Sequence, residues 1–166
     1  MQQVHTFAPV FDDRSRILIL GTFPSVKSRE NAFYYVHPQN RFWKVLAALW
    51  QEPVPETIPE KTVFLLRHSI ALWDVVERCD IIGSSDSSIK DVVPNDIGHL
   101  LSQAPVGRLF ANGKTAEALY HRYVEPTVGR KIQVLPSTSP ANAAWTLPRL
   151  VEQWQCVRTA AETPIR

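Results

Sequence analysis

The side chains that could do chemistry are amides, hydroxyls and aromatic rings. They gather in GTFPS at residues 21–25, FYYVHPQN at residues 33–40, FANGK at residues 110–114 and PSTSP at residues 136–140. Aromatic rings stack on nucleobases, asparagine amides bond to base edges, and serine hydroxyls with backbone N–H groups hold phosphate oxygens. The pattern indicates recognition of an extruded nucleobase. The candidate residues are Phe23, Ser25, Ser28, Phe33, Tyr34, Tyr35, Asn40, Asn112, Ser137, Thr138 and Ser139.

Motifs for several other chemistries are missing from the sequence. There is no G-x-G-x-x-G, Walker or G-x-S-x-G pattern, and the five histidines are scattered singly. Cys79 and Cys156 lie in no cluster with metal-ligand spacing, so we expect inert thiols in a reducing compartment, no metal and no cofactor. His37, close to Asn40, is either a structural residue or a site residue, and the sequence leaves both open.

Length and composition predict one domain, residues 1–166, of a size that can bury roughly 70% of its unfolded surface. The N-terminal residues lack a basic flank followed by an apolar block, and no apolar run approaches the ~18 residues of a membrane span. We therefore expect a cytoplasmic protein that does not enter membranes. Nothing in the sequence implies an obligate protein partner, and we expect a monomer.

The net charge is only +2, but the charges are unevenly distributed. Residues 1–50 hold six Lys/Arg against three Asp/Glu, residues 51–104 four against nine, and residues 105–166 eight against four. If both ends of the chain line one crevice, it would attract a polyanion while the acidic middle covers a remote face. Ordinary scatter of charge is the alternative. Four cations lie in the segment that carries most of the candidate site, Lys27, Arg29, Arg41 and Lys44.

The apolar pattern predicts strands that alternate with helices. Residues 17–20, 108–112 and 131–135 are short apolar runs typical of buried parallel strands. Residues 70–76 are a buried stretch whose periodicity fits helix or strand equally well. The predicted helices cover residues 42–49 behind Asn40 as cap, residues 63–66, the segment from Asn95 to residue 101, the segment after Gly113, and residues 147–157 behind Thr146.

The predicted loops place the candidate residues. Residues 51–61 are a proline-rich connector without regular structure, and residues 82–90 are a small-polar loop. Polar sequences lie at the ends of the three clear strands. GTFPS follows the first strand, NGK begins at the last residue of the second, and PSTSP follows the third. Because strands joined through helices run parallel, these ends meet at one edge of the sheet, where α/β proteins bind ligands. We predict an α/β fold with helices on both faces of a parallel sheet.

These motifs resemble those of a known family. GTFPS, FYYVHPQNRFW, LWDV with GSSDSSIK downstream, FANGK and LPSTSPAN are similar to the motifs of the uracil-DNA glycosylase superfamily, and within it to the hypoxanthine (deoxyinosine) DNA glycosylase branch. The resemblance covers about residues 17 to 154. It implies a three-layer α/β/α sandwich with a small central parallel sheet. It also implies that a damaged nucleotide is flipped into a pocket without metal or cofactor.

The resemblance implies a monofunctional glycosylase that hydrolyses the N-glycosidic bond of a deaminated base in DNA, hypoxanthine above all, and leaves an abasic site. Asn40 matches the water-positioning asparagine of the branch, and Asn112 matches its base-reading asparagine. Phe23 stands where many members of the superfamily carry the Asp or Asn that positions water, and is expected to pack on the base. Gly21 and Thr22 are expected to contact the base beside it.

DNA contacts are also implied. The last motif of the superfamily grips the DNA backbone and enters the groove near the lesion, and here its wedge position holds the small residues Ala141 and Asn142. The expected partner is DNA that contains a deaminated base. The predicted DNA-binding residues are Ser25, Ser28, Ser137, Thr138, Ser139, Ala141 and Asn142.

Each assignment has a simpler alternative. Asn40 can be only a helix cap, Asn112 only a turn residue, and PSTSP only a cap and loop. Two other functions stay open, namely action on uracil or on G:U and G:T mismatches, and nucleic-acid binding without catalysis. Core packing is the favoured interpretation for the aromatics beside the helix start, Tyr34, Tyr35 and Trp43.

Overall fold

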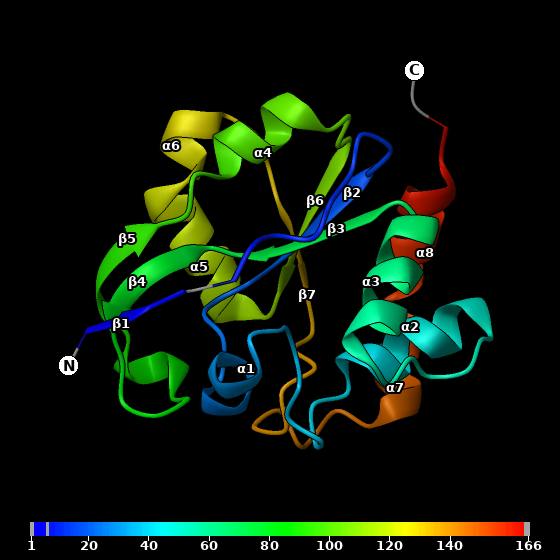
Figure 1. Ribbon diagram of the computed structural model, residues 1–166, viewed down its shortest axis with the longest axis horizontal. Coiled ribbons are helices and arrows are strands. Elements are labelled where there is room, and N and C mark those ends of the chain that lie inside the picture. Colours follow the sequence, from blue (N-terminus) through cyan, green and yellow to red (C-terminus); the bar gives the residue numbers. More distant parts are fainter. Residues whose placement is uncertain (1, 6, 165–166) are drawn as a thin grey trace.

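The computed structural model describes residues 2–5 and 7–164 as three layers (Figure 1). A four-stranded parallel sheet forms the middle layer and carries helices on both faces, as predicted. The strands are β1 Gln2–Val4, β2 Ile17–Gly21, β3 Ile70–Asp74, β4 Val76–Asp80, β5 Lys90–Pro94, β6 Arg108–Asn112 and β7 Gln133–Leu135. The helices are α1 Val26–Asn31, α2 Phe42–Trp50, α3 Ile58–Arg67, the 3₁₀ turn η1 Asp86–Ser88, α4 Ile97–Gln103, α5 Lys114–Tyr123, α6 Glu125–Val128, α7 Leu147–Gln153 and α8 Gln155–Glu162.

Strand β2 lies inside the parallel sheet, whose order is β3-β2-β6-β7. All of its residues are buried, as an uninterrupted apolar run predicts for a strand covered on both faces. It pairs with β3 up to Gly21 opposite Asp74, and with β6 on its other side. Strand β6 has the predicted bounds, whereas β7 begins at Gln133 rather than at residue 131.

Alternate side chains of β2 point into two cores. Ile17 and Ile19 face the core that contains side chains of α2, α3, α7 and α8, while Leu18 and Leu20 face the core that contains those of α4 and α5. Each fully buried aliphatic side chain contributes ~1.5–3 kcal/mol of stability. The sheet is therefore held from both sides, and its strand ends are fixed relative to one another.

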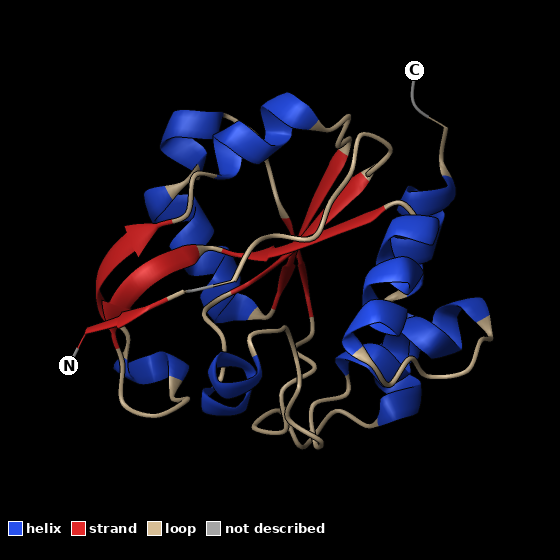
Figure 2. Ribbon diagram, in the orientation of Figure 1, coloured by secondary structure: helices blue, strands red, loops and turns tan. Residues whose placement is uncertain are grey.

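A second, antiparallel sheet of order β1-β4-β5 continues from the first and is absent from the predicted fold (Figure 2). Strand β4 follows β3 after only Val75, so residues 70–76 are extended rather than helical. Strand β1 occupies part of the polar lead-in to β2. The strands of this second sheet are short and half-exposed and lack a long apolar alternation. The sequence pattern therefore does not reveal them.

Several helix boundaries differ from the predicted ones. Helix α1 lies between the first predicted strand and the predicted helix at residues 42–49, where the sequence pattern predicts no helix, and Ser25 is its N-cap. Helix α3 starts at Ile58 inside the predicted connector, because Pro59 lies in the first turn, where the N–H that proline lacks has no helical partner. The predicted final helix divides at Trp154 into α7 and α8. None of the described helices is long and apolar enough to cross a bilayer.

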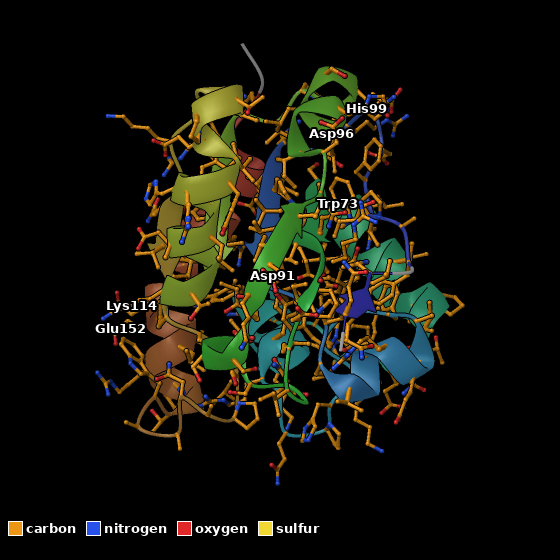
Figure 3. All side chains as sticks on the ribbon, turned by 90° about the vertical axis from the view of Figure 1, so that its left-hand side faces the viewer. Trp73, Asp91, Asp96, His99, Lys114 and Glu152 are labelled. Atoms are coloured by element: carbon orange, nitrogen blue, oxygen red, sulfur yellow. The ribbon has the colours of Figure 1, made fainter. Side chains whose placement is uncertain are left out.

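The start of α4 corrects another prediction. The N-cap is Asp96, not Asn95: the Asp96 carboxylate accepts from the backbone N–H of His99 at 3.1 Å, and Figure 3 labels both residues at this helix end. The Asn95 amide instead donates to the carbonyl oxygens of Asp74 and Val76, at 2.9 and 3.2 Å. Asn95 thereby holds the junction of β3 and β4, beside the carboxyl end of β3.

The loops that follow the parallel strands gather at one edge of the sheet, at the bottom of Figure 1. Trp154, which is fully buried, anchors the loop after β7. Its indole N–H donates to the carbonyl oxygen of Pro136 at 2.9 Å, and its ring packs edge-on against Phe42, with centroids 5.9 Å apart. Helix α2 and the junction of α7 and α8 therefore fix where this loop begins.

We expect Trp154→Phe to lower the free energy of unfolding by about 1–3 kcal/mol, because the half-buried carbonyl of Pro136 loses its donor while an aromatic ring stays in the core. Urea unfolding followed by circular dichroism measures the change. Trp50→Phe is the matched control, since the Trp50 indole bonds to Glu162 at the exposed surface, at 3.1 Å. Equal losses for the two variants would contradict the anchoring role.

Candidate active site

A cavity of ≈ 520 Å³ opens at the carboxyl edge of the parallel sheet. Its volume suits a small organic ligand, since such sites commonly measure about 300–1,000 Å³. The edge predicted from three strand ends is therefore confirmed as the place of the pocket. Every residue predicted to bind the base or the water lines the cavity, namely Gly21, Thr22, Phe23, Asn40 and Asn112. Of the predicted DNA-binding residues, all but Asn142 line it as well.

One chain of hydrogen bonds joins the two candidate asparagines. The Asn112 Nδ2 donates to the Thr138 hydroxyl at 3.0 Å, and this hydroxyl donates to Asn40 Oδ1 at 2.8 Å. The backbone N–H of Thr138 donates to Asn112 Oδ1 at 3.1 Å. Thr138 is fully buried, so water does not compete for these bonds. The loop after β7 thus locks both amides into one arrangement.

Asn40 combines a structural bond with an open amide nitrogen. Its Oδ1 also accepts from the backbone N–H of Phe42 at 3.0 Å, so it supports the start of α2 although the N-cap residue itself is Arg41. A backbone N–H can only donate, and this fixes which end of the Asn40 amide is oxygen. Among the residues that the structure describes, no group hydrogen-bonds to its nitrogen Nδ2, and Asn40 lines the cavity. The capping interpretation and the site interpretation of Asn40 are therefore compatible.

Arg41 ties the Asn40 loop to the loop after β7. Its backbone N–H donates to the Thr138 carbonyl at 3.1 Å. Its guanidinium donates to the carbonyl oxygens of Ser139 and Asn142, at 2.9 and 3.1 Å, and to that of Trp145. Arg29 is also bonded internally, to the carbonyl oxygen of Gly83 at 2.6 Å. Of the four cations near the site, the exposed ones are Lys27 and Lys44.

The serines at the site serve the protein backbone in different ways. Ser25 caps α1, and Ser28 is buried with its hydroxyl accepting from Val36 N–H at 3.2 Å. Ser137 and Ser139 accept from backbone N–H groups two residues further on, both at 3.1 Å. Such turns hold a loop in shape while leaving hydroxyl protons free to donate. Phosphate binding by these residues stays a prediction.

The remaining predicted residues take distinct positions. Phe23 is 8% exposed, and the Arg29 guanidinium lies 5.4 Å from its ring centroid. Ala141 lies at the cavity, whereas the Asn142 amide donates to the Ser137 carbonyl at 3.0 Å. His37 lines the cavity, and its Nδ1 accepts from Gln39 N–H at 3.1 Å. The predicted core packing is confirmed for Tyr34 and Trp43, and Tyr35 is partly buried against the same core, although Tyr34 and Tyr35 also border the cavity. Phe33, a candidate site residue, is buried in this core and does not line the cavity.

Two carboxylates of the cavity are missing from the sequence predictions. Asp74 ends β3 and Asp86 lies in the loop before β5. The run that precedes Asp74 fits helix or strand, and only the strand assignment brings its last residue to the same edge as Gly21 and Asn112. Two signals in the sequence could have identified Asp74, namely this strand assignment and its place in the motif LWDV. The serine-rich loop around Asp86 has no periodic pattern to place it.

The charges of the cavity fit ordinary scatter better than an acidic segment confined to a remote face. Asp74 and Asp86 both come from the acidic middle of the chain, so part of that segment lines the crevice. Desolvation of its carboxyl group at the cavity wall raises the pKa of Asp86 to about 6 although the residue as a whole is exposed, a hydrogen bond from Thr22 lowers it, and the charge of Asp74 raises it. The charge at this wall of the cavity thus changes close to neutral pH. Among the residues described, no cluster of His, Cys, Asp and Glu could hold a metal ion.

A three-layer α/β/α protein with a pocket of amides and hydroxyls at the carboxyl edge, large enough for a nucleobase, belongs to the class of proteins that can take up an extruded nucleobase. Residues 8–160 match the family model described as the uracil DNA glycosylase superfamily. The chain is a member of this superfamily.

Individual relatives agree with that membership. The chain is 36% identical over 156 residues to a hypoxanthine DNA glycosylase of Methanosarcina acetivorans, a match covering 91% of this chain and 95% of the relative. It is 33% identical over 138 residues to a hypoxanthine DNA glycosylase of Methanosarcina barkeri, covering 82% and 86%. The solution NMR structure of a candidate uracil DNA glycosylase from M. acetivorans is similar, with a TM-score of 0.81 and 32% identity over 98% of this chain and 100% of that one.

We expect Arg41→Gln to loosen the loop after β7, because each lost hydrogen bond from a charged donor removes about 1.5–3 kcal/mol of local stability. Hydrogen exchange read by mass spectrometry should show backbone exchange in residues 139–145 faster by roughly tenfold or more. The matched control is Lys44→Gln, which removes an exposed cation from α2. Equal protection of residues 139–145 from hydrogen exchange in the two variants would mean that Arg41 does not hold the loop.

Proposed function

We propose that this protein is a DNA glycosylase that removes hypoxanthine from deoxyinosine in DNA and leaves an abasic site. The observation that carries the proposal is the base-sized cavity where Asn40, Thr138 and Asn112 form one hydrogen-bonded chain. Membership of the superfamily supports DNA glycosylase activity. The two relatives described as hypoxanthine DNA glycosylases support the choice of base.

The proposed reaction joins the oxygen of water to C1′ of the sugar and breaks the bond from C1′ to N9 of the base. The base leaves with the bonding electron pair and takes a proton, and the attacking water loses one to solvent. Because the sugar develops oxocarbenium character, the water must be held close to C1′. Asn40 Nδ2 would donate to one lone pair of this water and leave another free for attack. An amide accepts no proton near neutral pH, so its contribution is positional.

Asn112 and Phe23 are proposed to hold the flipped base. Both bonds from Asn112 to Thr138 fix its amide plane, and each amide atom retains capacity for one more bond. Phe23 offers a buried ring at the cavity wall for packing on the base. The backbone of Gly21 and Thr22 lies beside it.

The proposed DNA contacts surround the mouth of the cavity. Ser25, Ser137 and Ser139 would donate to phosphate oxygens, and the exposed Lys27 and Lys44 would add charge. Arg29 and Arg41 are bonded to protein carbonyls and therefore contribute mainly by holding loops. Ala141 and Asn142 would lie nearest the groove. Their small side chains fill less of the space that the base vacates than an apolar wedge would.

Uracil is the second candidate base. The specific observation that favours it is the similarity to the solved structure described as a candidate uracil DNA glycosylase. Uracil is smaller than hypoxanthine but carries the same arrangement of a ring N–H beside a keto oxygen. A cavity of ≈ 520 Å³ admits either base, so the choice needs measurement.

The test is an incision panel of oligonucleotides that contain deoxyinosine, deoxyuridine or no lesion, with alkali to cut abasic sites. Deoxyinosine should be excised fastest, and activity should survive excess EDTA, because the proposed amide site uses no Lewis acid. Faster excision of deoxyuridine would favour the uracil assignment. Binding without any incision would favour a non-catalytic relative.

We expect Asn40→Ser to slow single-turnover excision of deoxyinosine by about 10- to 1000-fold with little change in folding, because a water-positioning group is lost while a capping side chain remains. Asn40→Asp keeps an acceptor for Phe42 N–H and Thr138, and its rate should depend on ionisation of the new carboxyl group. Asp96→Ser is the matched control, since Asp96 caps α4. Full activity of a folded Asn40→Ser protein would remove Asn40 from the mechanism.

A further inference from the structure

Two polar side chains of the cavity take no part in the chain through Thr138. Asp74 lies directly opposite Gly21 in the strand pairing and is 3% exposed. Tyr35 lies in the loop before α2, with its hydroxyl oxygen buried. A Cβ at Gly21 would overlap Asp74 Oδ1 and lie 2.6 Å from Tyr35 Oη. The two oxygens therefore crowd the same side of Gly21, where only a hydrogen fits.

Asp74 is held by one of its two oxygens. His5 Nε2–H donates to Asp74 Oδ2 at 2.9 Å. The His5 ring is packed against Phe7 and Tyr34, with centroid distances of 4.3 and 5.8 Å, so the donor is itself fixed. The other oxygen, Oδ1, is turned toward Gly21. Asp74 thus presents one oriented hydrogen-bond acceptor at the cavity.

The Tyr35 hydroxyl is an oriented donor. Burial raises the pKa of Tyr35 far above its usual value and the charge of Asp74 raises it further, so the phenol keeps its proton. Its ring stacks on Phe42, with centroids 4.1 Å apart and planes inclined by 16°. Within residues 2–5 and 7–164, no hydrogen bond of normal geometry reaches this hydroxyl, although the Asn112 side chain lies close enough to lower the pKa of Tyr35 somewhat. Because a buried hydroxyl without a partner is unfavourable, a ligand atom is the natural partner.

The backbone also holds Tyr35 in a demanding conformation. Its φ of 53° lies in the left-handed region, which bulky residues rarely adopt. The next residue, Val36, donates its N–H to the buried Ser28 hydroxyl at 3.2 Å, and this bond helps to keep the turn in place. Strain of this kind persists where surrounding contacts determine the conformation, and it is common at ligand sites.

We propose that Asp74 and Tyr35 read the lactam edge of the flipped base and so determine specificity for deaminated bases. The inference rests on the proposed function. Hypoxanthine carries N1–H beside the keto oxygen O6, so Asp74 Oδ1 accepts from N1–H and the Tyr35 hydroxyl donates to O6. Uracil offers the same pattern through N3–H and O4. The contact to the keto oxygen also stabilises charge that moves onto the base as the glycosidic bond breaks.

Adenine is rejected by the same two groups. It presents an unprotonated N1 beside an amino group, so the carboxylate faces a lone pair and the hydroxyl proton faces another donor. Sites built to hydrogen-bond a substrate discriminate strongly against analogues that leave those groups unpaired. A single donor–acceptor pair thus separates a deaminated base from its normal parent in DNA.

The test compares deoxyinosine with deoxynebularine, whose purine ring lacks both the N1 proton and O6. In single-turnover assays, Asp74→Asn and Tyr35→Phe should slow excision of deoxyinosine by about 10- to 1000-fold without slowing excision of deoxynebularine, which Asp74→Asn should even speed up because the carboxylate no longer faces the lone pair of N1. His5→Phe keeps a ring but removes the donor to Asp74, and should lower the ratio of the two rates by a smaller factor. Equal slowing of both substrates would overturn the proposal.

Stability separates this role of Tyr35 from a structural one. Tyr35→Phe removes a hydroxyl that has no partner within the described residues, so the thermal midpoint should stay the same or rise. Tyr34→Phe is the matched comparison, because the Tyr34 hydroxyl donates to the Ala8 carbonyl at 2.9 Å, and its midpoint should fall. A lower midpoint for Tyr35→Phe together with unchanged excision would show that its hydroxyl serves the fold.

The two proposals fail in different ways. If the folded wild-type protein excises hypoxanthine from no oligonucleotide, the proposed function is wrong. If the wild type excises hypoxanthine but the ratio of deoxyinosine to deoxynebularine rates is the same in Asp74→Asn, Tyr35→Phe and wild type, only the assignment of the lactam readers is wrong.

Discussion

The arrangement of the site depends on the direction of the hydrogen bonds through Thr138. Two backbone N–H groups, those of Phe42 and Thr138, can only donate, and they fix the oxygens of Asn40 and Asn112. The Thr138 hydroxyl has one proton, which goes to Asn40 because the Asn112 nitrogen already donates to it. No member of this chain can rotate alone without leaving a buried polar group unpaired, which typically costs about 1–3 kcal/mol. The open nitrogen of Asn40 is the outcome of that constraint.

This chain can form only because distant segments are held at one edge of the sheet. Parallel pairing aligns the ends of β2, β3 and β6, and Arg41 then binds the loop after β7 to the start of α2. Most of these bonds join a side chain to a backbone carbonyl or N–H. A backbone partner is available whatever the local sequence, so the loops keep their shape even with small residues such as Ala141 at the rim. The sheet and these hydrogen bonds therefore hold the loops in place, and only a few side chains at the cavity are left to contact a ligand.

The sequence predicts the parts of the fold that depend on local patterns. The apolar runs of β2 and β6 and the helical spacing of α2 locate the parallel sheet and its edge, and the polar motifs at strand ends locate the pocket. Local patterns do not reveal β1, β4 and β5, because β1 pairs with β4 far along the chain and the register between β4 and β5 is irregular. For the same reason the bond from His5 to Asp74 is invisible in sequence, since it spans 69 residues. The family resemblance assigned roles to the asparagines but none to the carboxylates, although Asp74 and Asp86 lie within the motifs LWDV and GSSDSSIK.

The carboxylates pose an electrostatic question for a site proposed to bind a polyanion. Asp74 and Asp86 oppose phosphate charge, while the exposed Lys27 and Lys44 lie outside the cavity, where DNA would approach. Under the proposed function, this separation suits the reaction: phosphates meet cations at the surface, and the sugar develops positive charge next to a cavity that contains carboxylates. The leaving base develops negative charge, and there Asp74 would be unfavourable unless it bonds a ring N–H. A lactam base supplies that N–H and an amino base does not, so the same carboxylate that helps a deaminated base opposes its parent.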